Sequence, residues 1–208
     1  MDILDSLEMR WFLPAGDAAT TRLQAWFAAI KDEGARTDHY LATGRADLSF
    51  KARLAEGKPA KLETKYLVGA LGTVDLTPAM SGDLQRWTKL SLAASDPELQ
   101  QQGSWLAVKK TRQLRKLSVD PGKGAATEVA ADTVVPAGCG VELTRLDYEV
   151  RGASRVDWTF GLEAFGPAPR LLDVFRATIA ALPTDGTVPP LGSIPSLSYA
   201  SWLLSLRM

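Results

Sequence analysis

The sequence predicts an α+β fold in which helices flank an antiparallel β-sheet. Three observations support this prediction. Apolar and polar residues alternate with period two in several segments, the polar positions of those segments are largely charged, and other segments carry apolar residues at helical spacing. The 208 residues are 46% hydrophobic, which is enough for a sizeable core. We expect one domain over 1–208, with its core at about 6–182 and a docked tail at 183–208.

The first expected strand spans 7–13, and a helix follows it. Met9 and Trp11 lie on one face of this strand, and acidic and basic residues lie on the other. A Pro-Ala-Gly-Asp turn ends the strand. Apolar residues between 23 and 30 then recur at the spacing of one helical face, which predicts an amphipathic helix.

Three further strands are expected at 38–41, 47–54 and 61–68, where charged side chains again alternate with apolar ones. Glycine and proline in the intervening segments predict turns, so these strands form an antiparallel meander. Apolar residues three positions apart in 81–93 predict a shorter helix. Its tryptophan, Trp87, is expected in the hydrophobic core.

The C-terminal half adds strands, a helix and the tail. A strand at 105–117 contains a basic run, and strands at 140–150 and 157–165 form a pair around a tight turn. The segment 118–138 is rich in Gly, Pro and Ala, and we expect a long hairpin loop with a short strand at its Thr-Val-Val tripeptide. Apolar residues at helical spacing predict a helix over 167–182.

Composition excludes several classes of protein. Lys and Arg total 24, as do Asp and Glu, so no net charge attracts the chain to nucleic acid or to an anionic membrane. The one cysteine, Cys139, excludes an internal disulfide and a cysteine-based zinc site, and we interpret it and the one histidine, His39, as structural. The first residues of the sequence are acidic, whereas a secretory leader begins with basic residues followed by an apolar stretch. No apolar run is long enough for a membrane span, so we expect a cytoplasmic protein.

The polar faces of the expected strands are strongly charged. Six cations and four carboxylates lie on them: Glu8, Arg10, Lys51, Arg53, Glu63, Lys65, Lys110, Arg112, Glu142 and Glu163. One interpretation is that these are the solvent faces of half-buried strands. The alternative is that the meander closes into a barrel and the charged faces line its interior. Like charges repel in such an interior, so it would have to hold water or a polyanionic ligand.

Seven short stretches follow one another along the chain: LEMRWFL (7–13), DHYL (38–41), LSFKARL (48–54), LETK (62–65), VKKTR (108–112), VEL (141–143) and GLEAFG (161–166). This succession resembles the CYTH superfamily, the triphosphate tunnel metalloenzymes, which include triphosphatases and a class of adenylate cyclases. The resemblance covers about residues 6–182. It implies an antiparallel barrel of about eight strands around a basic tunnel, in which cations bind a triphosphate and acidic residues hold one or two metal ions.

The resemblance also implies roles for the charged residues. The phosphate-binding set is Arg10, Lys51, Arg53, Lys65, Lys110 and Arg112, and the set that binds Mg²⁺ or Mn²⁺ is Glu8, Glu142 and Glu163. The first strand of the family carries Glu-x-Glu-x-Lys, whereas this chain has Glu8, Arg10 and Phe12 at those positions. Phe165 likewise stands where the last strand of the family often has a second Glu.

Two functions stay open from the sequence. The first is binding of a triphosphate-containing or other polyanionic small molecule with weak or absent hydrolysis, because Arg10 places a cation where the family has a metal ligand. The second is an active metal-dependent triphosphatase that uses the three remaining carboxylates. Nucleic-acid binding through the basic run at 109–116 is disfavoured, because neither a recognition helix nor an aromatic RNA motif accompanies it.

Overall fold

The computed structural model describes residues 2–54, 60–77, 80–94, 105–120 and 124–206. Nine strands lie in these ranges: β1 (Asp2–Pro14), β2 (Asp32–Leu41), β3 (Leu48–Leu54), β4 (Ala60–Thr77), β5 (Met80–Ala94), β6 (Trp105–Val119), β7 (Ala126–Val129), β8 (Gly138–Val150) and β9 (Ala153–Phe165). The helices are α1 (Ala18–Phe27), α2 (Leu171–Ala181) and α3 (Tyr199–Ser205), with a single 3₁₀ turn at Ala168–Arg170 directly before α2.

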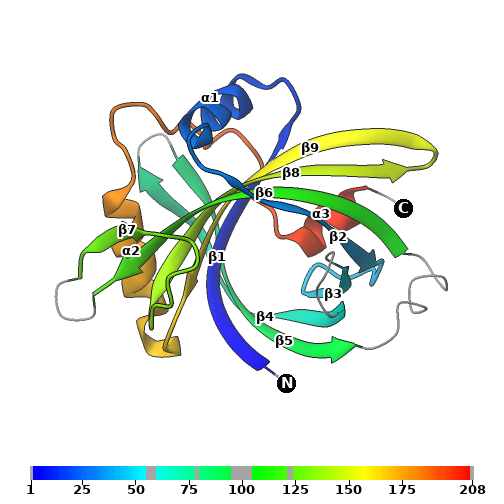
Figure 1. Ribbon diagram of the computed structural model, residues 1–208, viewed down its shortest axis with the longest axis horizontal. Helices are drawn as coiled ribbons and strands as arrows, with labels where there is room; N and C mark the ends of the chain where they lie inside the picture. The colour runs from blue at the N-terminus through cyan, green and yellow to red at the C-terminus, as the bar shows by residue number, and fades with distance from the viewer. Residues whose placement is uncertain (1, 55–59, 78–79, 95–104, 121–123, 207–208) are drawn as a thin grey trace.

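The strands form one antiparallel sheet that closes on itself. The order is β2-β3-β4-β5-β1-β9-β8-β6-β7, and an additional pairing of β2 with β6 joins the ends of the eight-stranded part. β7 extends the sheet beside β6, outside this ring. Figure 1 shows β1 crossing the middle of the molecule, with the long β4–β5 hairpin beside it. The closed antiparallel barrel with flanking helices that the sequence predicts is confirmed.

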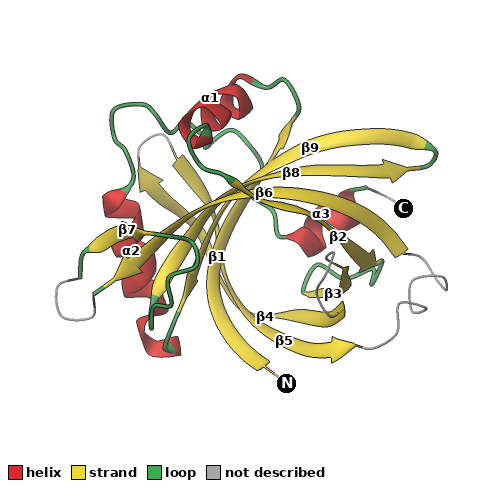
Figure 2. Ribbon diagram, in the orientation of Figure 1, coloured by secondary structure: helices red, strands yellow, loops and turns green. Residues whose placement is uncertain are grey.

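The larger hydrophobic core lies on the outer side of the barrel wall, under α1 and α2 (Figure 2). Met9 and Trp11 of β1 are at most 1% exposed and share this core with Phe27 of α1 and Phe175 of α2. Asp17 starts α1, since its side chain accepts a hydrogen bond from a backbone N–H of the first turn at 2.7 Å. Because side chains alternate along a strand, the other residues of β1 face the barrel interior.

The C-terminal tail docks at one end of the barrel and forms α3 there, a helix that the sequence pattern does not predict. Trp202 of α3 stacks on Phe12 with ring centroids 5.1 Å apart, and the edge of Tyr148 meets it at the same distance. Ser198 caps the helix by accepting a hydrogen bond from the backbone N–H of Ser201 at 3.1 Å. Among the described helices, none has the length and apolar character that a membrane span requires.

The predicted helix at 81–93 is wrong, because this segment lies in strand β5. β5 pairs with β1 on one edge and with β4 on the other. Residues three positions apart lie on opposite faces of a strand. Leu84 therefore packs in the outer core, whereas Trp87 is buried, as expected, but on the face of β5 that is turned to the barrel interior. Strand pairing along both edges outweighs the helical spacing of the apolar residues.

The short strand predicted at Thr-Val-Val 133–135 is also wrong. The residues of this loop that pair with β6 are those of β7, seven positions earlier. The hairpin is therefore tighter than the sequence suggests. The misplacement arises because β-branched composition alone does not fix which segment meets the neighbouring edge.

Candidate functional site

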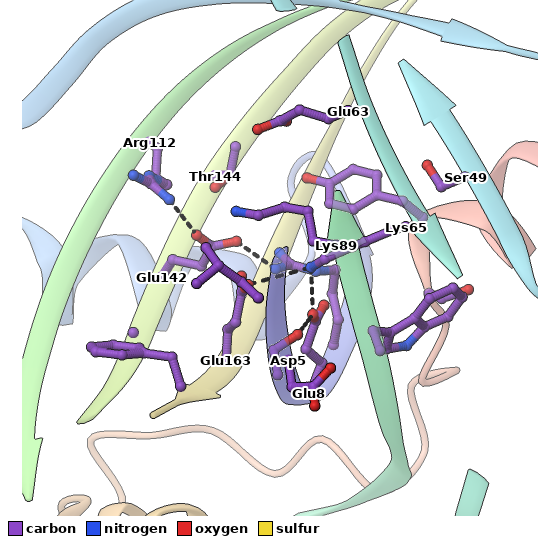
Figure 3. Close-up of a pocket in the computed structure, with 18 of the residues that line it drawn as sticks. Asp5, Glu8, Ser49, Glu63, Lys65, Lys89, Arg112, Glu142, Thr144 and Glu163 are labelled. Atoms are coloured by element: carbon purple, nitrogen blue, oxygen red, sulfur yellow. Dashed lines mark hydrogen bonds and ion pairs between the residues drawn. The ribbon is translucent and has the colours of Figure 1, made fainter. Parts of the chain in front are cut away.

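The barrel encloses a cavity of about 790 Å³. Nine cations and five carboxylates line it, comprising all ten residues of the charged strand faces and also Asp5, Arg36, Lys89 and Lys116. The interpretation that the charged faces line a tunnel is confirmed, and the interpretation as solvent faces is wrong. Figure 3 shows several of these side chains converging on the same space.

Asp38 is the centre of the first cluster of charges. The residue is fully buried, and its carboxylate lies 2.9 Å from Lys51 Nζ. The same carboxylate lies 3.1 Å from Arg53 Nε and 3.3 Å from Lys110 Nζ. Burial alone would raise the pKa of Asp38, but these three cations lower the pKa well below its usual range. Asp38 therefore stays ionised and fixes three cations at the surface of the cavity.

Glu63 holds two of the same cations from β4. Its carboxylate lies 3.2 Å from Lys51 Nζ and 2.9 Å from Arg53 Nη2. Burial would raise the pKa of Glu63, but these neighbours lower it to about 2. Burial also lowers the pKa of Lys51 to about 8 and that of Lys110 to about 7. Both ammonium groups are therefore close to titration at neutral pH, and a bound anion would favour their charged forms.

Lys110 also contacts two aromatic rings. Its Nζ donates a hydrogen bond to Tyr40 Oη at 2.5 Å and lies 3.6 Å from the ring centroid of Tyr199. The two tyrosine rings stack with centroids 5.6 Å apart. Because Tyr199 belongs to α3, the docked tail contributes part of the cavity wall.

Arg10, Glu142 and Arg112 form a second cluster. Arg10 Nη2 lies 2.5 Å from Glu142 Oε1, and Arg10 Nη1 donates to Thr159 Oγ1 at 3.0 Å. Arg112 Nη1 contacts the other oxygen of Glu142 at 3.1 Å. Gly161 leaves room for this arrangement, since a Cβ at that position would lie 2.6 Å from Arg10 Cζ. Both oxygens of Glu142 are thus engaged by guanidinium groups.

Lys65 joins the two remaining carboxylates of the predicted metal site. Its Nζ donates a hydrogen bond to Glu8 and lies 3.3 Å from Glu163 (Figure 3). Burial would lower the pKa of Lys65, but Glu163 and Glu8 raise it. The lysine is therefore firmly charged, and both carboxylates share its ammonium group.

The three predicted metal ligands do not fit Mg²⁺ or Mn²⁺ in this arrangement. Glu142 is held by two guanidinium groups, and Glu8 and Glu163 are held by Lys65. Over the ranges that the structure describes, no group of three His, Cys, Asp or Glu side chains is arranged to hold a metal ion. A divalent cation would have to displace Lys65 or the guanidinium groups to reach carboxylate oxygens.

Two polar groups in the cavity wall are available to a bound molecule. Thr144 is 1% exposed, and its Oγ1 has no hydrogen-bond partner in the part of the chain that the structure describes. Lys89 is half-buried and makes no ion pair or hydrogen bond with another described residue, although its charge helps to lower the pKa values of Glu63 and Glu163. Leaving a buried hydroxyl unpaired costs roughly 1–3 kcal/mol, so a ligand or a water molecule at Thr144 stabilises the site.

Several residues of the site were missed by the sequence analysis. Asp38 lies in a segment expected to be only four residues long, too short for its face to be assigned. Lys89 was hidden by the predicted helix, whereas in a strand it shares a face with Trp87. Tyr199 reaches the cavity from the tail, and no local sequence pattern reports such a long-range contact.

Comparison of the sequence with family models and with curated proteins finds no match. Three solved structures are similar in fold. A candidate adenylyl cyclase from Hippeastrum, described as having a dominant triphosphatase activity, is 12% identical and matches over 97% of this chain and 95% of its own, with a TM-score of 0.39. The RNA triphosphatase of S. pombe is 11% identical over 86% and 77%, with a TM-score of 0.45. A candidate adenylate cyclase from Bacillus halodurans is 10% identical over 87% and 95%, with a TM-score of 0.37.

The closed eight-stranded barrel and its charged interior agree with the architecture that the sequence resemblance implies. Similarity at 10–12% identity and these TM-scores concerns the course of the chain alone. The chemistry of the cavity therefore has to be derived from the side chains that line it.

Proposed function

We propose that the barrel binds a triphosphate-containing or other polyanionic small molecule, with weak or absent metal-dependent hydrolysis. The decisive observation is that the carboxylates that a catalytic metal would need are held by cations of the cavity. Arg10 and Arg112 engage Glu142, and Lys65 engages both Glu8 and Glu163. Guanidinium and ammonium groups therefore supply the positive charge that a metal ion supplies in a metal-dependent enzyme.

The arrangement of the cations suits several phosphate groups at once. Asp38 fixes Lys51, Arg53 and Lys110 on one side of the cavity, and Arg112 lies with Glu142 on another. Cations whose positions are already fixed lose little conformational entropy when an anion arrives. Charge-assisted hydrogen bonds from guanidinium and ammonium groups to phosphate oxygens are short and strong.

The second function, a metal-dependent triphosphatase, would require Mg²⁺ or Mn²⁺ to displace Lys65 or the two guanidinium groups. The ion would then polarise a phosphoryl oxygen and orient water for attack on phosphorus. Phosphate release that depends on the metal concentration distinguishes this enzyme from a binding protein.

Lys89 offers a direct test of the proposal. Because Lys89 makes no ion pair with another described residue, Lys89→Gln removes a cation of the cavity and leaves the other ion pairs in place, while Glu63 and Glu163 lose only a longer-range charge. A charge-assisted contact contributes roughly 1.5–3 kcal/mol, so we expect Lys89→Gln to weaken tripolyphosphate binding at least about tenfold. Calorimetry measures the affinity, and the thermal shift measures the stabilisation that binding brings.

The matched control is Lys109→Gln, because Lys109 is exposed on the outer face of β6. This control should bind tripolyphosphate as the wild type does. A wild-type protein that binds no tripolyphosphate would refute the proposed function. Equal affinities for the wild type and Lys89→Gln would place the anion away from Lys89.

A further inference from the structure

The cavity wall has an apolar part as well as a charged part. We call this part the apolar collar, and it consists of Leu4, Trp87, Val135, Pro136 and Phe165. Trp87 is 3% exposed, yet it belongs to neither of the two hydrophobic clusters that the described residues form. Trp87 therefore has little surface left to contact a ligand, and the apolar surface that a ligand could contact belongs to Leu4, Val135, Pro136 and Phe165.

The strand register places the collar directly beside the charged part. Ser6 of β1 pairs with Trp87 on one edge and with Phe165 on the other. The two aromatic residues therefore lie two strand spacings apart, which is roughly 10 Å, and flank the same point of the wall. Glu8 is the next inward residue of β1, about 7 Å further along the strand, and it accepts the hydrogen bond from Lys65.

The collar lies at the open end of the cavity. Leu4 is 53% exposed although it lines the cavity, whereas Tyr199 of the tail contacts Phe12, eight residues further along β1. A molecule that enters past Leu4 with its anionic end first would reach the cations. Any group attached to that anion would then remain between Trp87 and Phe165.

We propose that the ligand is a phosphate or polyphosphate ester of an apolar organic group, and that the collar holds this group; the inference rests on the anion binding proposed above. A cavity of about 790 Å³ is in the upper part of the range, roughly 300–1,000 Å³, of pockets that hold drug-sized molecules. A bare polyphosphate leaves the exposed surfaces of Leu4, Pro136 and Phe165 in contact with water. An apolar ester removes that surface from water, and each buried methylene group raises the affinity about fourfold.

Pyrophosphate and geranyl diphosphate form a matched pair of probes, because they share the diphosphate and differ in the apolar group. We expect calorimetry to give at least about tenfold tighter binding of geranyl diphosphate, from the burial of two or more carbon groups. Phe165→Ala removes a half-buried ring of the collar, so it should remove about tenfold of that advantage and leave pyrophosphate binding unchanged. Leu4→Asn changes an exposed position, so it tests the collar even if Phe165→Ala does not fold.

The matched control is Leu92→Asn, since Leu92 is 47% exposed on β5 and does not line the cavity. Equal affinities of the two probes for the wild type would overturn the collar proposal while leaving the proposed anion binding intact. A geranyl advantage that survives both collar variants would also overturn it.

A protein that binds neither diphosphate nor tripolyphosphate would refute the anion binding itself, and the collar proposal with it. Preference for ATP over tripolyphosphate without a geranyl advantage would show that the collar selects a polar group, contrary to the proposal.

Discussion

Replacing Glu142 by glutamine should destabilise the protein and at the same time strengthen its binding of a polyanion. The carboxylate is buried and engages Arg10 and Arg112 at 2.5 and 3.1 Å. Breaking a buried ion pair costs roughly 3–5 kcal/mol. Arg112 keeps its second partner, Glu33, at 2.5 Å, so we expect a loss near the lower end, about 3 kcal/mol, in urea unfolding.

The same change should raise the affinity for tripolyphosphate. Removing Glu142 takes a negative charge out of the cavity and leaves the guanidinium groups of Arg10 and Arg112 free to contact phosphate. Two unit charges 4 Å apart interact by about 4 kcal/mol at an effective dielectric constant of 20. About a third of that energy is enough to change an affinity tenfold. We therefore expect about tenfold tighter binding by calorimetry in EDTA.

The opposite result would refute this reasoning. If Glu142 served as a metal ligand, Glu142→Gln would weaken binding in Mg²⁺ and leave binding in EDTA unchanged. An unchanged or lower affinity in EDTA therefore contradicts the account. Glu149→Gln is the matched control, because Glu149 is exposed on the same strand and should alter neither stability nor binding.

Three further predictions follow from the same geometry. Lys51 and Lys110, with pKa values of about 8 and 7, should take up protons when a polyanion binds, so the affinity should decrease as the pH rises from about 6 to about 9. Calorimetry in buffers of different ionisation enthalpy measures this proton uptake, and proton release on binding would contradict the prediction. Glu63, whose pKa is lowered from 4.5 to about 2, contributes stability above pH 4.5 that is lost as the pH falls through about 2; a melting temperature that stays constant over this range would be inconsistent with its ion pairs. Gly161→Ala should displace the Arg10 guanidinium and cost roughly 1–3 kcal/mol in urea unfolding, whereas wild-type stability would show that Arg10 is not fixed there.

The charged lining of the cavity could be predicted from the sequence because side chains alternate along a strand. Once 47–54 is assigned as a strand, Lys51 and Arg53 must share a face, and the same reasoning applies to Glu63 with Lys65. The apolar residues of the opposite faces show which side is packed against helices. The roles of these residues in binding phosphate or metal stay predictions, since placement in the cavity does not assign a role.

The partners within the cavity could not be predicted, because they depend on contacts between distant strands. Asp38 collects cations from β3 and β6, and no spacing in the sequence relates 38 to 110. The apolar neighbours of Trp87 repeat every three residues, which predicts a helix. The segment is nevertheless a strand, because β5 pairs with β1 on one edge and with β4 on the other. Such pairings are set by the closure of the whole barrel rather than by local propensity.

The central claim is that side-chain cations, rather than a bound metal, attract the ligand into the barrel. Calorimetric titration of the wild-type protein with tripolyphosphate, once in EDTA and once in excess Mg²⁺ with phosphate release followed in parallel, tests it most directly. We predict tight binding in EDTA and no phosphate release above the background in either condition. Binding that appears only with Mg²⁺, together with steady phosphate release, would contradict the claim and identify a metal-dependent triphosphatase.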